Sequence, residues 1–139
     1  MAVEIDVEYL GDLHCEATHG PSGHAFVTDA PVDNGGKGDA FSPTDLVATA
    51  QASCILTIMG LVAQENGLDL SGARAHVTKE MVADPRRRIG TLSVTVSVPG
   101  GERLSEEDRA KLENAANVCP VKQSLHPDVN VVIEFVYPQ

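Results

Sequence analysis

The most continuous apolar stretch of the chain lies within Ser42–Asn66, and most of that stretch holds no charged residue. Its beginning is marked by Ser42, a good N-cap residue, and by Pro43, which fits the first helical position. Asp45 can complete a capping box with Ser42, and Gly67 can take the left-handed conformation that ends a helix. We therefore predict one long helix over this range. Because the helix is apolar on nearly all sides, we expect it to be buried in the centre of the molecule.

An uncharged run of this length is also typical of a membrane span. Small alanines dominate its first half, however, and the polar residues Thr49, Gln51, Ser53 and Thr57 interrupt it. The run also lies well inside the chain, so it is not a signal peptide. We interpret it as a core helix and expect no membrane partner.

Outside this helix, apolar and polar residues alternate, which is typical of strands with one buried face. Six segments are predicted as strands: Val3–Tyr9, Leu13–Thr18, Ala25–Thr28, Ala73–Val82, Ile89–Val98 and Val129–Tyr137. A second helix is predicted over Glu106–Asn117, where Ser105 and the acidic residues after it form an N-terminal cap. Cys119 then precedes a short helix that starts with Pro120. This order of elements predicts an α+β domain.

Length, charge and cysteine count narrow the possible functions. With 139 residues the chain suits a single domain over residues 1–139. Its net charge of −10 argues against nucleic acid as a partner, because phosphates require a basic surface. Three cysteines without a targeting segment indicate the reducing cytoplasm. The thiols lack metal-binding spacing and the glycine-rich segment Pro31–Phe41 lacks a phosphate-binding signature, so we expect no metal and no cofactor.

Two of the cysteines are candidates for chemistry. Cys119 lies at the start of a predicted helix, which favours the reactive thiolate. Cys54 lies inside the long helix, where apolar surroundings raise the pKa of a thiol unless a cation or a hydrogen-bond donor is near. A cysteine in an apolar helix is also common as a small buried hydrophobic residue. Cys15, on a predicted strand, is interpreted as a passive residue.

The chain resembles the OsmC/Ohr family of osmotically induced and organic hydroperoxide resistance proteins, and is closest to its OsmC-like branch. The resemblance rests on two motifs: Ser42-Pro43-x-Asp45-Leu46 leading through an alanine-rich run to Cys54, and Cys119-Pro120-Val121-x-x-Ser124-Leu125. It implies an antiparallel six-stranded sheet wrapped around two central helices, in an intertwined homodimer.

The resemblance also implies an activity, the thiol-dependent reduction of organic hydroperoxides. By motif, Cys54 corresponds to the cysteine that attacks the peroxide and becomes a sulfenic acid. Cys119 corresponds to the cysteine that condenses with it to a Cys54–Cys119 disulfide, and a lipoyl-type dithiol is the expected reductant. The alternative on the same fold is a redox-sensing or small-ligand-binding stress protein with weak or no peroxidase activity.

Overall fold

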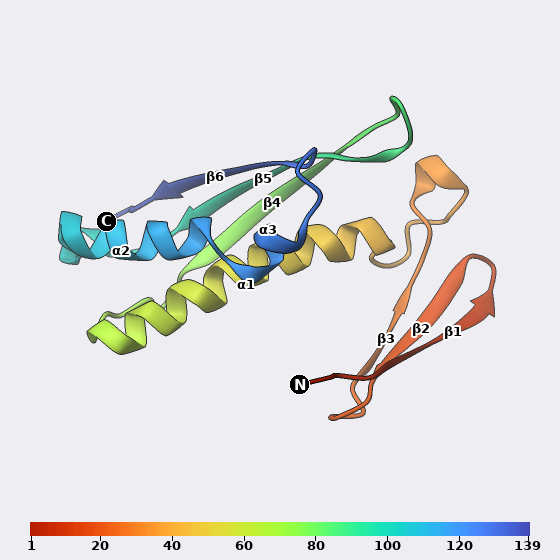
Figure 1. The fold of residues 1–139 in the computed structure, drawn as a ribbon, viewed down its shortest axis with the longest axis horizontal. Coiled ribbons are helices and arrows are strands. Elements are labelled where there is room, and N and C mark those ends of the chain that lie inside the picture. The colour runs from red at the N-terminus through yellow and green to blue at the C-terminus, as the bar shows by residue number, and fades with distance from the viewer. The chain divides into compact units, whose positions relative to one another are not determined.

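The structure is a computed structural model that describes residues 1–139. Six strands and three α-helices confirm the α+β class (Figure 1). The chain divides into two compact units, residues 1–47 and residues 48–139, and the long helix α1 (Pro43–Asn66) crosses the boundary between them. That the chain forms a single domain stays a prediction.

A three-stranded antiparallel sheet makes up most of the first unit. Its strands β1 (Ile5–Gly11), β2 (His14–His19) and β3 (Ala25–Thr28) pair in the order in which they occur in the chain. The turn between β1 and β2 passes through Asp12 and Leu13, whose φ angles are 54° and 63°. The three predicted strands of this meander are therefore confirmed, with small differences at their ends.

The apolar side chains of this sheet are largely exposed in the single chain. The large apolar residues of β1 to β3 that are at least 39% exposed are Ile5, Val7, Tyr9, Leu10, Phe26 and Val27. Contiguous exposed apolar surface is typical of a region that another surface covers. The sheet of the first unit thus leaves most of its large apolar side chains uncovered in the single chain.

Helix α1 begins and ends where the sequence predicts. The side chain of Ser42 accepts a hydrogen bond from the Asp45 N–H at 3.1 Å, and the Asp45 carboxylate accepts one from the Ser42 N–H at 2.9 Å. Gly67 follows the helix with a φ of 64°. Both features satisfy backbone groups that a helix end leaves free.

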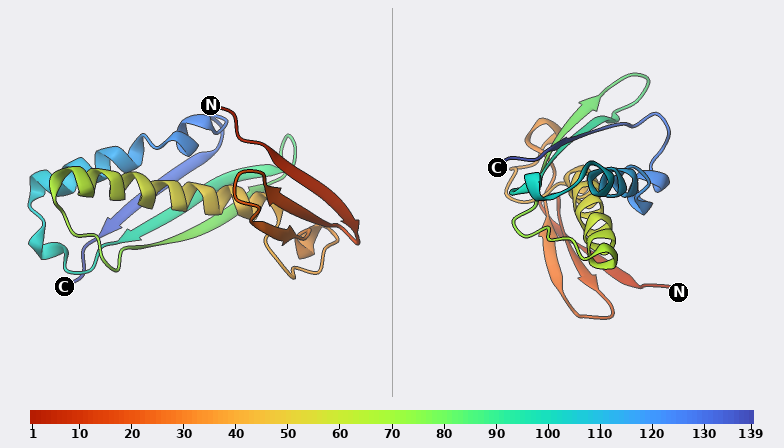
Figure 2. Two further views of the ribbon diagram at one scale, coloured as in Figure 1. Left: turned by 90° about the horizontal axis from the view of Figure 1, so that it is seen from below. Right: turned by 90° about the vertical axis from the view of Figure 1, so that its left-hand side faces the viewer.

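Helix α1 was predicted to be buried in the centre of the molecule, but in the single chain only one of its faces is buried. Its buried residues follow the helical repeat along one face: Ala48, Gln51, Ala52, Ile55, Met59 and Ala63. Other apolar positions are open, and Leu61 is 50% exposed. Burial is one-sided because the elements of residues 48–139 cover only one face of the helix (Figure 2). By length and composition α1 could also cross a membrane, and 33% of its most apolar window is buried.

The second unit holds another three-stranded sheet with β5 (Arg88–Ser97) in its centre. β4 (Arg74–Val82) pairs with β5 as an antiparallel hairpin, and β6 (Asn130–Val136) pairs with the other edge of β5. Leu92 and Val96 are fully buried, as the alternation along this strand predicts. The part of α1 from residue 48 on and α2 (Glu106–Asn117) lie side by side on one face of this sheet (Figures 1 and 2).

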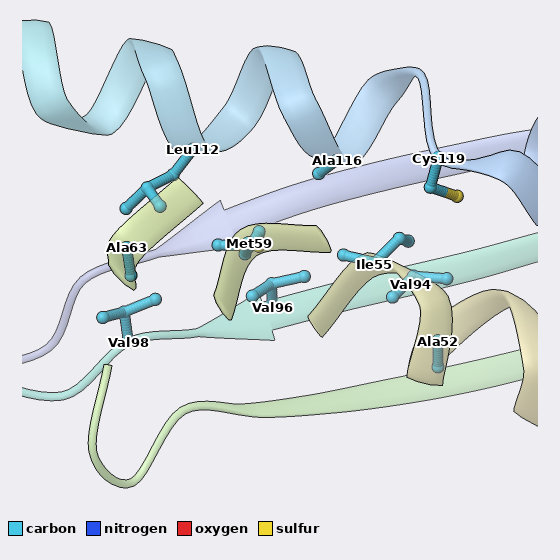
Figure 3. Close-up of a cluster of buried hydrophobic side chains, with 10 residues drawn as sticks. All are labelled: Ala52, Ile55, Met59, Ala63, Val94, Val96, Val98, Leu112, Ala116 and Cys119. Atoms are coloured by element: carbon cyan, nitrogen blue, oxygen red, sulfur yellow. The ribbon is translucent and has the colours of Figure 1, made fainter. Parts of the chain in front are cut away.

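The core of the second unit forms where these elements meet. Figure 3 shows its buried members: Ala52, Ile55, Met59, Ala63, Val94, Val96, Val98, Leu112, Ala116 and Cys119. They come from α1, β5 and α2, and Cys119 follows α2. Its side chains are aliphatic apart from Met59 and Cys119, in a chain of which only 4% is aromatic. Cys119 is thus part of the packed interior.

The prediction of one antiparallel six-stranded sheet was wrong for the single chain in two respects. The strands form two separate three-stranded sheets, because α1 connects β3 to β4 and takes the place of a hairpin. β6 is parallel to β5. Parallel neighbours need a crossover connection, and α2 with α3 (Pro120–Ser124) provides it.

Candidate functional site

The structure brings together Cys54 and Cys119, the two residues that the sequence singled out. Cys54 lies in the middle of α1 and is half-buried, whereas Cys119 is 0% exposed. The side chain of Cys54 interacts with the Cys119 thiol and with the backbone N–H of Val121. Both cysteines are free thiols. The arrangement therefore brings two free thiols together, because Cys54 packs against the core cluster that contains Cys119, and the more exposed thiol is the one on the long helix.

The position of Cys119 results from the break between α2 and α3. Val118 leaves the helical conformation with a φ of −120°, and Cys119 continues in extended conformation with a ψ of 148°. Pro120 then starts α3, as predicted, because its missing N–H is not needed at the first helical position. The Cys119 thiol makes no capping hydrogen bond to α3. Its side chain instead joins the core between α2 and α1 (Figure 3).

The surroundings of Cys54 favour its protonated form. Burial in apolar surroundings is the main cause that raises the pKa of the Cys54 thiol above its ordinary value of 9.0. The neighbouring Cys119 raises this pKa further, while the N–H of Val121 lowers it by donating a hydrogen bond to the sulfur. No cation is among these influences. The raised pKa of Cys54 agrees with the sequence-based expectation for a thiol inside an apolar helix.

A third residue of the site, Gln51, was missed by the sequence reasoning. Its Nε2 donates a hydrogen bond to the Sγ of Cys119 at 3.2 Å, and its side chain is 0% exposed. Gln51 lies one helical turn before Cys54, so the two residues share a face of α1. The signal that could have found it was the occurrence of an amide in an otherwise apolar helix at that spacing.

Cys15 belongs to the first unit and lies on β2, opposite Thr28 of β3. It is half-buried and lines an open hollow of about 300 Å³ together with Tyr9, Leu13 and Pro43. Nothing in its surroundings distinguishes it chemically, so its interpretation as a passive residue stays a prediction.

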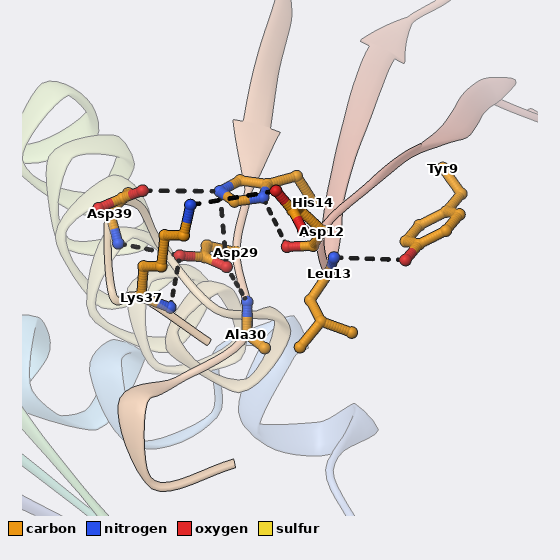
Figure 4. A network of polar contacts seen from close by, with 8 residues as sticks. All are labelled: Tyr9, Asp12, Leu13, His14, Asp29, Ala30, Lys37 and Asp39. Atoms are coloured by element: carbon orange, nitrogen blue, oxygen red, sulfur yellow. Dashed lines mark hydrogen bonds and ion pairs between the residues drawn. The ribbon is translucent and has the colours of Figure 1, made fainter. Parts of the chain in front are cut away.

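One group of side chains in the first unit could hold a metal ion. His14, Asp29 and Asp39 place their ligand atoms within 4.8 Å of one another (Figure 4). The sequence did not single out this group, because its members are spread over a strand and a loop. The Asp29 carboxylate already accepts hydrogen bonds from the N–H groups of Ala30, Lys37 and Asp39, at 2.7–3.2 Å. It therefore has a sufficient role without a metal, which is to hold the loop that leads to α1.

The pKa of Asp29 agrees with that role. The hydrogen bond from the Asp39 N–H is the main cause that lowers the pKa of Asp29, and Ala30, His14 and Lys37 act in the same direction. The Nδ1 of His14 lies 2.8 Å from the Asp12 carbonyl, while its Nε2 faces the two carboxylates at 3.5 and 3.8 Å. The network holds its residues together through complementary charges and donors.

Comparison with known proteins places these features in a family. The family model described as OsmC-like protein matches residues 36–134, a range that includes both Cys54 and Cys119. A solved structure from Psychrobacter arcticus 273-4, described as an osmotic stress induced and detoxification response protein, is 43% identical. It covers 95% of this chain and 94% of its own, with a TM-score of 0.88.

More distant relatives carry names that refer to hydroperoxides. A Staphylococcus aureus protein named organic hydroperoxide resistance protein-like is 25% identical over 119 residues, which are 81% of this chain and 85% of that protein. The structure of an organic hydroperoxide resistance protein OsmC from Legionella pneumophila covers 97% of this chain and 96% of its own, with a TM-score of 0.75. At 20% identity, this likeness concerns the fold alone.

Proposed function

Because the chain belongs to the OsmC/Ohr family, we propose that it is a thiol-dependent peroxidase that reduces organic hydroperoxides. The observation that carries the proposal is that the two cysteines lie together: Cys54 packs against the core cluster that contains Cys119, and Gln51, one turn before Cys54 on α1, donates a hydrogen bond to the Cys119 sulfur. The name of the Staphylococcus aureus relative, which refers to organic hydroperoxide resistance, supports the substrate class.

In the first step, the Cys54 thiolate attacks the terminal oxygen of the hydroperoxide. The O–O bond breaks, the sulfur keeps the hydroxyl group as a sulfenic acid, and the alkoxide leaves and takes up a proton to become an alcohol. The difference in exposure supports this division of roles. A peroxide can reach the half-buried Cys54, while Cys119 is 0% exposed.

In the second step, the Cys119 thiolate attacks the sulfur of the Cys54 sulfenic acid. Its electron pair forms the S–S bond, the S–O bond breaks, and the departing hydroxide takes up a proton to become water. An external dithiol, of lipoyl type by resemblance, reduces the disulfide by two exchange steps and becomes a cyclic disulfide itself. No cofactor enters this cycle.

We further propose that the chain acts as a homodimer. The exposed apolar side chains of β1, among them Ile5 and Val7 at 60% and 65% exposure, form a surface that a second copy would cover. Exposed apolar positions of α1 such as Leu61 support the same conclusion. A homodimer of this kind would act in the cytoplasm, with no nucleic acid and no membrane as partners.

A redox-sensing or small-ligand-binding protein is the second candidate function. It is favoured by the raised pKa of Cys54 and by the lack of a cation among the influences on that thiol. A thiol with a raised pKa is mostly protonated at neutral pH and therefore reacts slowly with peroxide. In this alternative, disulfide formation occurs once as a signal, or does not occur, and turnover with a dithiol is weak or absent.

The test is free-thiol counting with intact-mass spectrometry, before and after one equivalent of cumene hydroperoxide. The wild type, with its three cysteines, is expected to lose two thiols and about two mass units. Cys54→Ser should lose no thiol and no mass. Cys15→Ser is the matched control and should react like the wild type. With an excess of cumene hydroperoxide, Cys119→Ser should accumulate sulfinic and sulfonic acid at Cys54, because no second thiol removes the sulfenic acid. Three unchanged thiols in the wild type would refute the peroxidase proposal.

A further inference from the structure

Gln51 is the one polar residue of α1 that is buried, and the proposed cycle does not use its amide. Gln51 is 0% exposed and lies on the same helix face as Ala52 and Ile55, which are core residues. Its Nε2 donates to the Sγ of Cys119 at 3.2 Å. Its other polar atom, Oε1, is buried without any hydrogen-bond partner.

This half-satisfied amide is unfavourable for stability. A buried polar atom without a partner loses its hydration and receives nothing in exchange, so an apolar side chain of the same shape would serve the core better. The packing of α1 therefore gives no reason for an amide at position 51. Its one interaction is with the sulfur that performs the second step of the proposed cycle.

An amide suits a sulfur that changes its protonation state. The N–H group of Gln51 can donate to a thiolate, and the C=O group, after a half-turn of the amide, can accept the S–H of the protonated thiol. A disulfide sulfur carries no proton and no full charge, so both of these hydrogen bonds are weaker with a disulfide than with the thiolate or the thiol. The amide thus favours the reduced form of Cys119 and holds its sulfur in place.

We propose that Gln51 is a positioning residue that holds the Cys119 thiolate toward Cys54 and thereby accelerates closure of the disulfide. This inference rests on the proposed function, because that function includes the step in which the Cys54–Cys119 disulfide closes. During that step, the electron pair of the Cys119 thiolate forms the bond to the Cys54 sulfur, and hydroxide leaves from the sulfenic acid. Gln51 transfers no proton and no electron. It acts only through its hydrogen bond to the attacking sulfur.

The test uses Gln51→Met, which keeps the length of the side chain but has no N–H donor. After rapid mixing with cumene hydroperoxide, formation of the Cys54 sulfenic acid should proceed as in the wild type, while closure of the disulfide should be about tenfold slower. The dithiol–disulfide equilibrium, measured against dithiothreitol, should shift toward the disulfide by about five- to tenfold. Closure and equilibrium within twofold of the wild type would overturn the proposal.

Urea denaturation separates this role from a packing role. Since Gln51→Met removes a buried unpaired oxygen, its urea midpoint should equal or exceed that of the wild type. A lower midpoint would identify Gln51 as a packing residue and overturn the proposal. Gln51→Glu, which keeps the shape but replaces the donor by an acceptor, should slow closure at least as much as Gln51→Met; closure as fast as in the wild type would also overturn it.

The dithiol–disulfide equilibrium can be measured without peroxide. The proposed peroxidase function and the proposed role of Gln51 can therefore fail separately. A wild type that ignores cumene hydroperoxide but forms the Cys54–Cys119 disulfide with oxidised dithiothreitol would refute the peroxidase function. The same experiment would still decide whether Gln51→Met shifts the equilibrium. A wild type that forms no Cys54–Cys119 disulfide with any oxidant would overturn both.

Discussion

The rate at which Cys54 reacts with peroxide should rise with pH through the whole neutral and mildly alkaline range. The thiolate is the reacting form, and the structure raises the pKa of Cys54 above 9.0, chiefly by burial. At pH 7 even a thiol with a pKa of 9.0 is only about 1% thiolate, and each further pH unit increases that fraction about tenfold. The rate should therefore increase about tenfold from pH 7 to pH 8 and should not level off below pH 9.

The assay is a single turnover with cumene hydroperoxide, quenched at set times with a thiol-alkylating reagent, and free thiols are then counted by mass. Cys54→Ser provides the background at each pH, and circular dichroism confirms that the protein stays folded. Cys119→Ala removes a neighbour that raises the pKa of Cys54. In this variant the reaction of Cys54 with peroxide should be faster at pH 7 than in the wild type, and its rate should level off at a lower pH.

A rate that is independent of pH, or that levels off at or below pH 8, would refute this reasoning. Such a profile would mean that a cation or a further donor stabilises the Cys54 thiolate in the working protein. The surroundings of Cys54 within one chain would then be an incomplete description of the site. The result would also count against the second candidate function, because an activated thiol is what a peroxidase needs.

Three further predictions concern stability, each measured as the free energy of unfolding in urea at fixed protein concentration. Leu112→Ala should cost about 3–5 kcal/mol, because the side chain is 0% exposed in the core that also holds Cys119; a loss below about 1 kcal/mol would contradict the packing described. Ser42→Ala should cost about 0.5–2 kcal/mol through loss of its bond to the N–H of Asp45, and an unchanged midpoint would mean that this cap is dispensable. Gly36→Ala should cost about 1–3 kcal/mol, because the added Cβ would overlap the Ala30 carbonyl; wild-type stability would show that this loop yields easily.

Local sequence patterns predicted most of the helices and strands. The errors concern how elements that are distant in the chain are arranged. The bounds of α2 were predicted as Glu106–Asn117 and are found there, because Ser105 caps the helix and the chain breaks at Val118. The six strands were placed within a few residues, because alternation reveals which segments are half-buried. The parallel direction of β6 was not predicted, since it depends on the path that α2 and α3 take between two strands.

The same holds for the candidate site: the sequence predicted the local surroundings of each cysteine, and the tertiary structure decided which residues contact them. The sequence by itself determined that Cys54 lies inside an apolar helix and that Cys119 precedes a proline-started helix, because each environment is set by residues a few positions away. Only the tertiary structure decided that the two thiols meet, that Val121 donates to Cys54 and that Gln51 donates to Cys119. These contacts join segments that are distant in the chain. Their geometry depends on how α2 packs against α1, which no local pattern encodes.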